Sequence, residues 1–443
     1  MTATVVQAYR FALDPTPAQC AALASHCGAA RVAYNWGLEL VKARLDQRRA
    51  DPSVDVPWTL ATLRKEWNRT KHEIAPWWAE NSKEAYSSGL DGLARALKNF
   101  TDSRNGHRKG RRVGFPARKR KNRARPTCRF TTGAIRVLPD RKHVQLPRIG
   151  VIKSHESTRK LARRIEQGSA RILAATISKT ADRWFVSFTV EVDRRVPASN
   201  GRTTVVGVDV GIRHLAVLST EAPPIANPRA LEVSLRRIRR LNRQLARGKR
   251  GSNRRALVRR RLRRTHARAA NIRRDAFHKL TTALATQHGT IVVEQLNVQG
   301  MLRNRRLARA VADAGMAELR HQLWYKTSWY GSRLLLANPF YPSSKTCSAC
   351  GWVKAKLTLD EHIFRCEACG AATDRDRNAA RNLAKLAHDV AQSGWETQTA
   401  RGANCETQLA ELVAMKREAG SRSGPSPAPL SHKVRLLSSA DTR

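Results

Sequence analysis

Residues 345–383 read KTCSACGWVKAKLTLDEHIFRCEACGAATDRDRNAARNL, a stretch in which paired cysteines are followed directly by aspartates. The cysteines have the spacing C-x2-C-x15-C-x2-C and are Cys347, Cys350, Cys366 and Cys369. Two such pairs of thiolates can close a tetrahedron around one Zn2+ ion. Because four thiolates leave no open coordination position, we expect a structural zinc ribbon at 346–370 that takes no part in hydrolysis.

Three carboxylates in separate segments have the pattern of a hydrolytic metal site. Asp209 lies in the strand-like run VVGVDVG, Glu294 ends the apolar run IVVE, and Asp376 precedes a helix expected at 377–388. Hydrolysis of a phosphodiester by two Mg2+ ions requires carboxylates that converge from different elements, and Mg2+ prefers oxygen ligands. We therefore predict a two-magnesium site at these three acids.

Each acid also fits a structural role when taken alone. Asp209 could belong to a turn, Glu294 to a salt bridge at a strand end, and Asp376 to a helix N-cap. Asp374 competes with Asp376, and we favour Asp376 because the helix is expected to begin directly after it. The glycines that flank Asp209, Gly207 and Gly211, are expected to allow a phosphate backbone to approach closely.

The charge balance points to a polyanionic partner. The 443 residues include 83 Lys and Arg but only 35 Asp and Glu, which gives a formal net charge of +48. Nucleic acid is the expected partner and an anionic membrane the weaker alternative. No apolar run is long enough to span a membrane, and the first residues lack the layout of a signal peptide. We therefore expect a soluble protein of the prokaryotic cytoplasm, associated with the nucleoid. The single cysteine cluster fits a reducing compartment with one metal site and not a disulfide framework.

Two segments concentrate the positive charge. Residues 104–125 contain eleven Lys and Arg and no acid, and residues 234–274 contain seventeen Arg, one Lys and no acid. The first segment is either a solvated loop or a clamp on a phosphate backbone, and we favour the clamp. The second is expected to form a helical hairpin whose apolar seam comprises Leu235, Ile238, Leu241, Leu245, Ala256, Leu257 and Leu262. The candidate nucleic-acid contacts are Arg118, Lys119, Arg120, Lys121, Arg236, Arg239, Arg240, Arg243, Arg259, Arg260 and Arg263.

The remaining sequence predicts a multidomain protein of the α/β and α+β classes. A strand at 5–13 is followed by helices at 16–43, from about 60 and at 82–100, whose tryptophans we assign to a core rather than to base stacking. Strand patterns from 129 onward include a pair joined at Ala181-Asp182. The helical unit 16–125 is thus inserted into a β unit formed by 1–15 and 126–200. Residues 391–443 are rich in Ser, Pro and Gly and are expected to form a disordered tail.

The chain resembles TnpB, the OrfB-type protein of insertion sequences that is related to RuvC-bearing type V CRISPR effectors. The resemblance extends from Tyr9 to about Leu386. It is most specific in VVGVDVGIRHLAVLS, in IVVEQLNVQGM, and in the ribbon with DRDRNAARNL. The N-terminal YRFALDPTPAQ, GAARVAYNWGLEL and GFPARKRK also match.

The resemblance implies an RNase H-like RuvC nuclease domain at 201–345 and 371–390, with the zinc ribbon inserted and the arginine-rich hairpin included. It implies a wedge-like β-barrel that carries the helical unit as a recognition module. It also implies that a guide RNA from the flank of the element directs cleavage of target DNA beside a short motif. The sequence does not determine the oligomeric state, for which we favour a monomer. The alternatives are an RNA-guided regulator that binds without cutting, and a transposase that performs strand transfer itself.

Overall fold

The computed structural model describes residues 2–108, 110–121, 123–195, 197, 201–358 and 360–393. The tail predicted at 391–443 lies outside these residues, except for 391–393, which end the last helix. None of the helices within the described ranges combines the length and the apolar character that crossing a membrane requires.

The N-terminal part contains a seven-stranded antiparallel sheet in the order β2-β6-β7-β1-β5-β4-β3. Strand β1 has a different partner along each of two stretches. Its residues 2–12 pair with β7, and its last residues pair with β5. Within the described residues no pairing joins the outer strands β2 and β3. The strands are β1 (Thr2–Asp14), β2 (Thr127–Phe130), β3 (Arg136–Val137), β4 (His143–Leu146), β5 (Gly150–Ser154), β6 (Ala170–Thr180) and β7 (Arg183–Arg195).

The predicted turn at Ala181-Asp182 is confirmed. Strands β6 and β7 pair up to Thr180 and Arg183, which leaves two residues between them. Ala181 and Asp182 both have positive φ, at 49° and 72°. Two successive left-handed residues match the twist of a hairpin with a two-residue loop.

The helical unit packs on this sheet through a common hydrophobic core. Its helices are α1 (Pro17–Ala50), α2 (Leu60–Ile74), the short η1 (Trp78–Glu80) and α3 (Lys83–Arg104), and a small helix α4 (Arg159–Glu166) follows β5. Leu90 and Leu93 of α3 belong to the same buried cluster as Phe188 of β7. The first helix is longer than predicted and ends at Ala50. Trp67 is buried, as the assignment to a core predicts, whereas Trp77 is 39% exposed.

The second sheet has five strands in the order β10-β9-β8-β11-β12. Strand β11 runs parallel to both β8 and β12, whereas β9 is antiparallel to β8 and β10 to β9. The strands are β8 (Val205–Asp209), β9 (His214–Leu218), β10 (Ile225–Ala226), β11 (Thr290–Glu294) and β12 (Arg333–Ala337).

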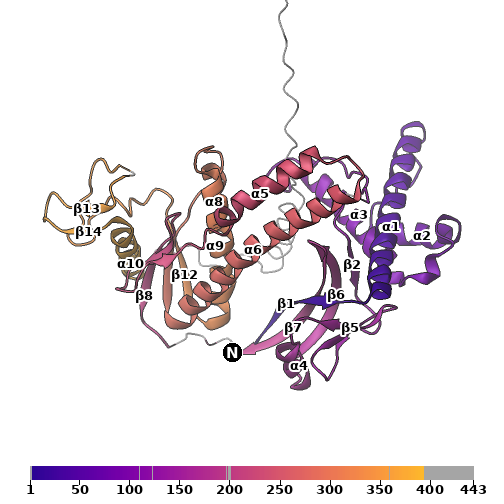
Figure 1. The fold of residues 1–443 in the computed structure, drawn as a ribbon, viewed down its shortest axis with the longest axis horizontal. Helices are drawn as coiled ribbons and strands as arrows, with labels where there is room; N and C mark the ends of the chain where they lie inside the picture. Colours follow the sequence, from indigo (N-terminus) through magenta and orange to yellow (C-terminus); the bar gives the residue numbers. More distant parts are fainter. Residues whose placement is uncertain are drawn as a thin grey trace, which may run out of the picture. The chain divides into compact units, whose positions relative to one another are not determined.

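Helices cover both faces of this sheet (Figure 1). On one face Val206, Val208 and Val293 pack against α6 (Asn253–Gln287) and α9 (Met316–Tyr330). On the other face Val292 packs against Leu383 of α10 (Arg375–Ser393). Adjacent residues of a strand therefore enter different cores, as the alternation of side chains along a strand requires.

The arginine-rich segment forms a hairpin of α5 (Ala230–Arg247) and α6, which lie side by side in Figure 1. The predicted seam is partly wrong. Ile238 and Leu241 are buried, but Ala256 and Leu257 are exposed, and Val258 takes the buried position. The short helices α7 (Val298–Met301) and α8 (Ala308–Ala314) connect β11 to α9.

Candidate metal centres

Asp209 and Glu294 lie side by side at the ends of neighbouring strands. Asp209 is the last residue of β8 and Glu294 the last of β11, and the parallel pairing aligns Val208 with Val293. The carboxyl ends of parallel strands are where α/β sheets usually place their ligands. Local strand geometry therefore brings together two of the three acids predicted from the sequence.

Asp376 and Asp374 have different roles at the start of α10. The helix begins at Arg375, before Asp376, so the expectation that it begins after Asp376 is wrong. The backbone N–H groups of Asp376 and Arg377 both donate to Asp374 Oδ1, each at 3.0 Å. Asp374 is therefore the residue that caps the helix. Asp376 as the metal ligand stays a prediction, and its carboxylate is not used as the cap.

The charges at this edge of the sheet influence one another. Burial raises the pKa of the Asp209 carboxyl well above its usual range, and the nearby carboxylates of Glu294 and Asp376 raise it further. The guanidinium of Arg375 acts in the opposite direction and lies 3.4 Å from Asp376 Oδ1. Carboxylates that disfavour one another's ionisation are typical of sites that a cation neutralises.

Gly207 has a role other than the one predicted. A Cβ atom at this position would lie 1.9 Å from the carbonyl oxygen of Ala380 and 2.6 Å from the backbone nitrogen of Ala384. The glycine thus allows α10 to pack directly on β8, and does not face a phosphate. This close packing places the helix that carries Asp376 against the strand that carries Asp209.

The four cysteines form a cluster of the kind that the spacing predicts. Their Sγ atoms all lie within 4.8 Å of one another. Cys347 and Cys369 are 3.8 Å apart, and Cys350 and Cys366 are 3.6 Å apart. A tetrahedral site with Zn–S bonds of about 2.3 Å places its sulfurs about 3.8 Å apart, so the cluster fits zinc.

The cysteine cluster lies on a small sheet of its own. Strand β13 (Ile363–Arg365) pairs with β14 (Ala372–Asp374), and a bridge joins Thr346 to Val353. Phe364 is fully buried beside Cys347 and Cys366. Within the described ranges, these cysteines are the only group of three or more His, Cys, Asp or Glu side chains whose ligand atoms lie close enough to hold one ion. The carboxylates of Asp209, Glu294 and Asp376 are not gathered as tightly.

The predicted nucleic-acid contacts differ in their surroundings. The seven arginines predicted on the hairpin are exposed, but Arg260 forms an ion pair with Asp182 at 3.1 Å. Lys119 Nζ lies 3.6 Å from the centre of the Tyr34 ring, and its backbone N–H donates to Asn35 Oδ1. These contacts fix the backbone of the 118–121 segment against α1.

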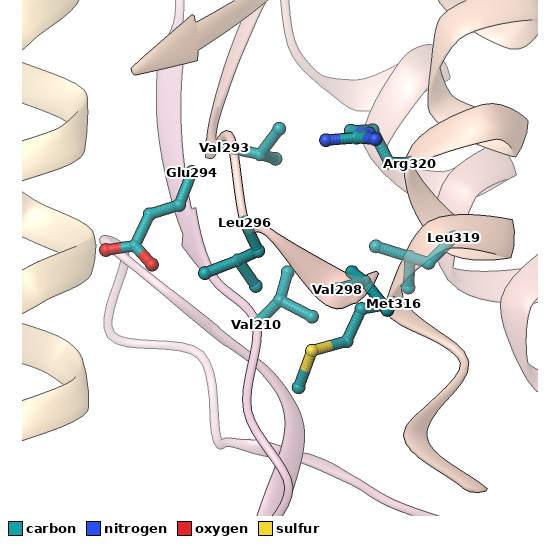
Figure 2. A pocket seen from close by; sticks show the side chains of 8 residues that line it. All are labelled: Val210, Val293, Glu294, Leu296, Val298, Met316, Leu319 and Arg320. Atoms are coloured by element: carbon teal, nitrogen blue, oxygen red, sulfur yellow. The ribbon is translucent and has the colours of Figure 1, made fainter. Parts of the chain in front are cut away.

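Sequence reasoning missed Ser343. Its hydroxyl donates to Glu294 Oε1, and the serine is only 3% exposed. Figure 2 shows the Glu294 carboxylate pointing away from the small apolar pocket beside it, which is lined by residues such as Val210 and Leu319. No local signal marks this serine, because the contact joins residues 49 positions apart in the chain.

Three family models match the chain. OrfB_IS605, described as a probable transposase, matches residues 187–305, and a Cas12f1-like TNB domain matches 317–383. The helix-turn-helix model of OrfB_IS605 matches residues 1–50. In the structure, this last region is a strand followed by one uninterrupted helix, so it contains no helix-turn-helix.

Relatives match along almost the whole chain. A Mycobacterium tuberculosis (strain ATCC 25618 / H37Rv) protein whose name describes an RNA-guided DNA endonuclease is 41% identical, over 96% of this chain and 92% of its own. InsQ of Escherichia coli (strain K12), named in the same way, is 30% identical over 92% of this chain and 99% of its own. This chain is a member of the OrfB family of TnpB-like proteins.

A more distant similarity links the family to CRISPR effectors. The CRISPR-associated endodeoxyribonuclease Cas12f1 of Sulfoacidibacillus thermotolerans is 27% identical over 50% of this chain and 55% of its own. A chain in the cryo-EM structure of a Cas12f1-sgRNA-target DNA complex shares 11% identity, with a TM-score of 0.49 over 86% of this chain and 99% of that chain.

Proposed function

We propose that this protein is an RNA-guided, Mg2+-dependent DNA endonuclease. The observation that carries the proposal is the position of Asp209 and Glu294 at the adjacent ends of β8 and β11, with Asp376 in the first turn of the helix that packs on β8. The names of full-length relatives describe the same activity. The guide RNA comes from the flank of the element, and the target is DNA beside a short motif.

The architecture that we propose for this function has two main parts. The mixed sheet with helices on both faces supports an RNase H-like RuvC domain at 201–345 and 371–390, into which a zinc ribbon at 346–370 is inserted. The seven-stranded sheet at 1–15 and 126–200 serves as the wedge-like barrel, and 16–125 as the recognition unit.

The donor atoms at the sheet edge suit magnesium. Asp209, Glu294 and Asp376 offer carboxylate oxygens only, from two strand ends and the first turn of a helix. Magnesium bound there, as two ions, supplies the activation of a water nucleophile and the stabilisation of the leaving oxygen. Burial, and after it the neighbouring carboxylates, raise the pKa of Asp209, so a cation bound beside it would favour its ionised form.

The zinc that we assign to the four cysteines is structural. All four sulfurs face one another at distances that suit a closed tetrahedral site, which leaves no position for a substrate. Strand β14 pairs with β13 of the ribbon, lies just beyond the proposed boundary at residue 370, and ends with the Asp374 cap of α10. It therefore holds the start of the helix that carries Asp376.

The exposed arginines of the hairpin bind the guide RNA and the heteroduplex. The charge of +48 has no internal counterpart, because 35 acids face 83 basic residues. Replacing Arg239 by Gln is expected to lower the slope of log K against log salt by about one, for one lost phosphate contact. Replacing Arg260, which pairs with Asp182, serves as the matched comparison and should change the slope less.

The proposed function is tested with protein purified from bacterial cells that also express the native flank of its element. A plasmid library carries the matched target beside randomised bases and is incubated with Mg2+ or with EDTA. Mg2+-dependent cutting, restricted to plasmids with one short motif, supports the guided nuclease. Target binding without cutting indicates a regulator, joined donor–target products indicate a strand-transfer enzyme, and the lack of bound RNA contradicts the guided activity.

The oligomeric state is proposed as a monomer. Light scattering of the RNA-bound protein tests this directly, because one chain of 443 residues with one RNA differs clearly in mass from a dimer.

A further inference from the structure

The segment between β12 and the first cysteine pair contacts both metal centres. It begins after Ala337, passes Ser343, and reaches Cys347 four residues later. Ser343 donates from its hydroxyl to Glu294 Oε1, and Cys347 is one of the four clustered cysteines. One short stretch of chain therefore joins a predicted ligand of magnesium to a predicted ligand of zinc.

Two asparagines on one face of α10 hold this segment in place. Asn382 Nδ2 donates to the carbonyl oxygens of Ser343 and Thr346, at 2.7 and 2.6 Å. Asn378 Nδ2 donates to the same Thr346 oxygen at 2.7 Å, while Asn378 Oδ1 accepts the backbone N–H of Ser348 at 2.8 Å. We call these contacts the asparagine clamp.

The clamp is buried, so its hydrogen bonds are not exchanged with water. Asn378 is 0% exposed and Asn382 is 2% exposed. The two asparagines are four residues apart, so they lie on the same face of the helix. Buried polar groups of this kind favour a single arrangement of the side chains and backbone groups that they join. Any other arrangement would leave a buried donor or acceptor without a hydrogen bond. The clamp therefore determines where the hydroxyl of Ser343 lies relative to Glu294.

The Ser343 hydroxyl has a chemical reason to contact Glu294. An ionised carboxylate can only accept hydrogen bonds, and a serine hydroxyl can donate one without adding charge. The bond occupies one lone pair of Oε1 and leaves the other oxygen, Oε2, and the remaining lone pairs for a cation. Residues that hydrogen-bond to a metal ligand in this way orient it, and their loss commonly weakens metal binding.

We propose that Ser343 is a positioning residue for Glu294, and that the asparagine clamp makes α10 a common support for both metal centres. The same helix then carries Asp376 in its first turn and, through the clamp and Ser343, positions Glu294 of β11. The inference rests on the proposed function, because it takes Glu294 to be a ligand of the catalytic ion.

The test measures binding of Mn2+, as a probe for Mg2+, by electron paramagnetic resonance on the full chain with its co-purified RNA. Glu294→Ala supplies the background of ions bound to RNA. Ser343→Ala is expected to weaken the Glu294-dependent binding by about 10- to 100-fold. Ser344→Ala makes the same chemical change at the next residue and should bind Mn2+ as the wild type does.

Two further variants separate positioning from a general loss of structure. Ser343→Thr retains a hydroxyl and should recover part of the affinity, and Asn382→Ala should weaken it in the same direction as Ser343→Ala. Zinc content and bound RNA should equal those of the wild type in Ser343→Ala.

Unchanged Mn2+ affinity in Ser343→Ala, with Glu294-dependent binding present in the wild type, would overturn this inference and leave the proposed nuclease intact. A wild type that binds no more Mn2+ than Glu294→Ala would instead overturn the catalytic metal site itself, and the inference with it.

Discussion

The cysteine cluster and the three carboxylates are assembled in opposite ways. The cysteines come from one stretch of 23 residues, 347–369, and their sulfurs are already gathered within 4.8 Å. The carboxylates come from positions 209, 294 and 376 and are gathered less tightly. Burial raises the pKa of Asp209, and the neighbouring carboxylates of Glu294 and Asp376 raise it further, so these acids disfavour one another's ionisation.

This difference is the one that we expect between a structural metal centre and a catalytic one. A closed site of four local ligands stabilises its own fold and excludes substrate. A site of few, distant and mutually repelling ligands depends on the rest of the protein for its geometry and keeps coordination positions open for substrate. Gly207, which lets α10 reach β8, and the asparagine clamp are the devices that provide this geometry.

The largest effect is expected from removing one catalytic carboxylate. Asp209→Ala, Glu294→Ala and Asp376→Ala should each reduce guided DNA cleavage by about a thousandfold or more, since losing several kcal/mol of electrostatic stabilisation costs tenfold per 1.36 kcal/mol. Bound RNA and zinc should remain as in the wild type. Cleavage at the wild-type rate by Glu294→Ala would remove that residue from the site.

A substitution in the cysteine cluster should disturb the structure around it before it affects DNA cleavage. Cys350→Ser removes one of four sulfur ligands, and zinc content measured by mass spectrometry should fall from one per chain toward zero. Protease cleavage should then begin within 346–370, while the N-terminal sheet stays resistant. Retention of zinc with full resistance would show that the cluster does not depend on four thiolates.

The raised pKa of Asp209, caused by burial and then by the neighbouring carboxylates, should appear in the pH dependence of stability without divalent cations. Because the pKa of Asp209 is higher in the folded than in the unfolded state, the folded state holds the proton more tightly. The free energy of unfolding should therefore fall as pH rises from the ordinary pKa of an aspartate toward the raised one. Thermal unfolding of Asp209→Asn should lack this decline, and an identical pH profile would contradict the assignment.

The smallest effect should come from the aspartate that caps α10. Asp374→Ala removes an N-cap and should lower the free energy of unfolding by about 1 kcal/mol. Cleavage should fall far less than in Asp376→Ala, and Asp374→Ser should restore most of the stability. An equal loss of cleavage in the Asp374 and Asp376 variants would show that both bind metal.

Local patterns carried most of what could be predicted. Cysteine spacing identifies the zinc site because its ligands are neighbours in sequence, and the apolar runs before Asp209 and Glu294 identify strands that end in acids. The same reasoning could not separate Asp374 from Asp376, since the helix start is known only from the cap geometry.

Contacts between segments that are far apart in the sequence could not be predicted. The role of Gly207 depends on Ala380, and that of Ser343 depends on Glu294 and Asn382. Neither position has a distinctive local pattern. In the hairpin, the seam was misplaced by one residue, from Leu257 to Val258, because an arginine-rich helix offers few apolar residues to define its phase.

The most direct test of the central claim is metal rescue at the cleaved bond. A target carrying a phosphorothioate in place of a non-bridging oxygen is cut by the guide-loaded protein in Mg2+ and in Mn2+. If magnesium held by these acids contacts that phosphate, sulfur should suppress cleavage in Mg2+, a hard ion, and Mn2+ should restore it. Equal cleavage of both targets in Mg2+, for either sulfur position, would contradict a metal site at Asp209, Glu294 and Asp376.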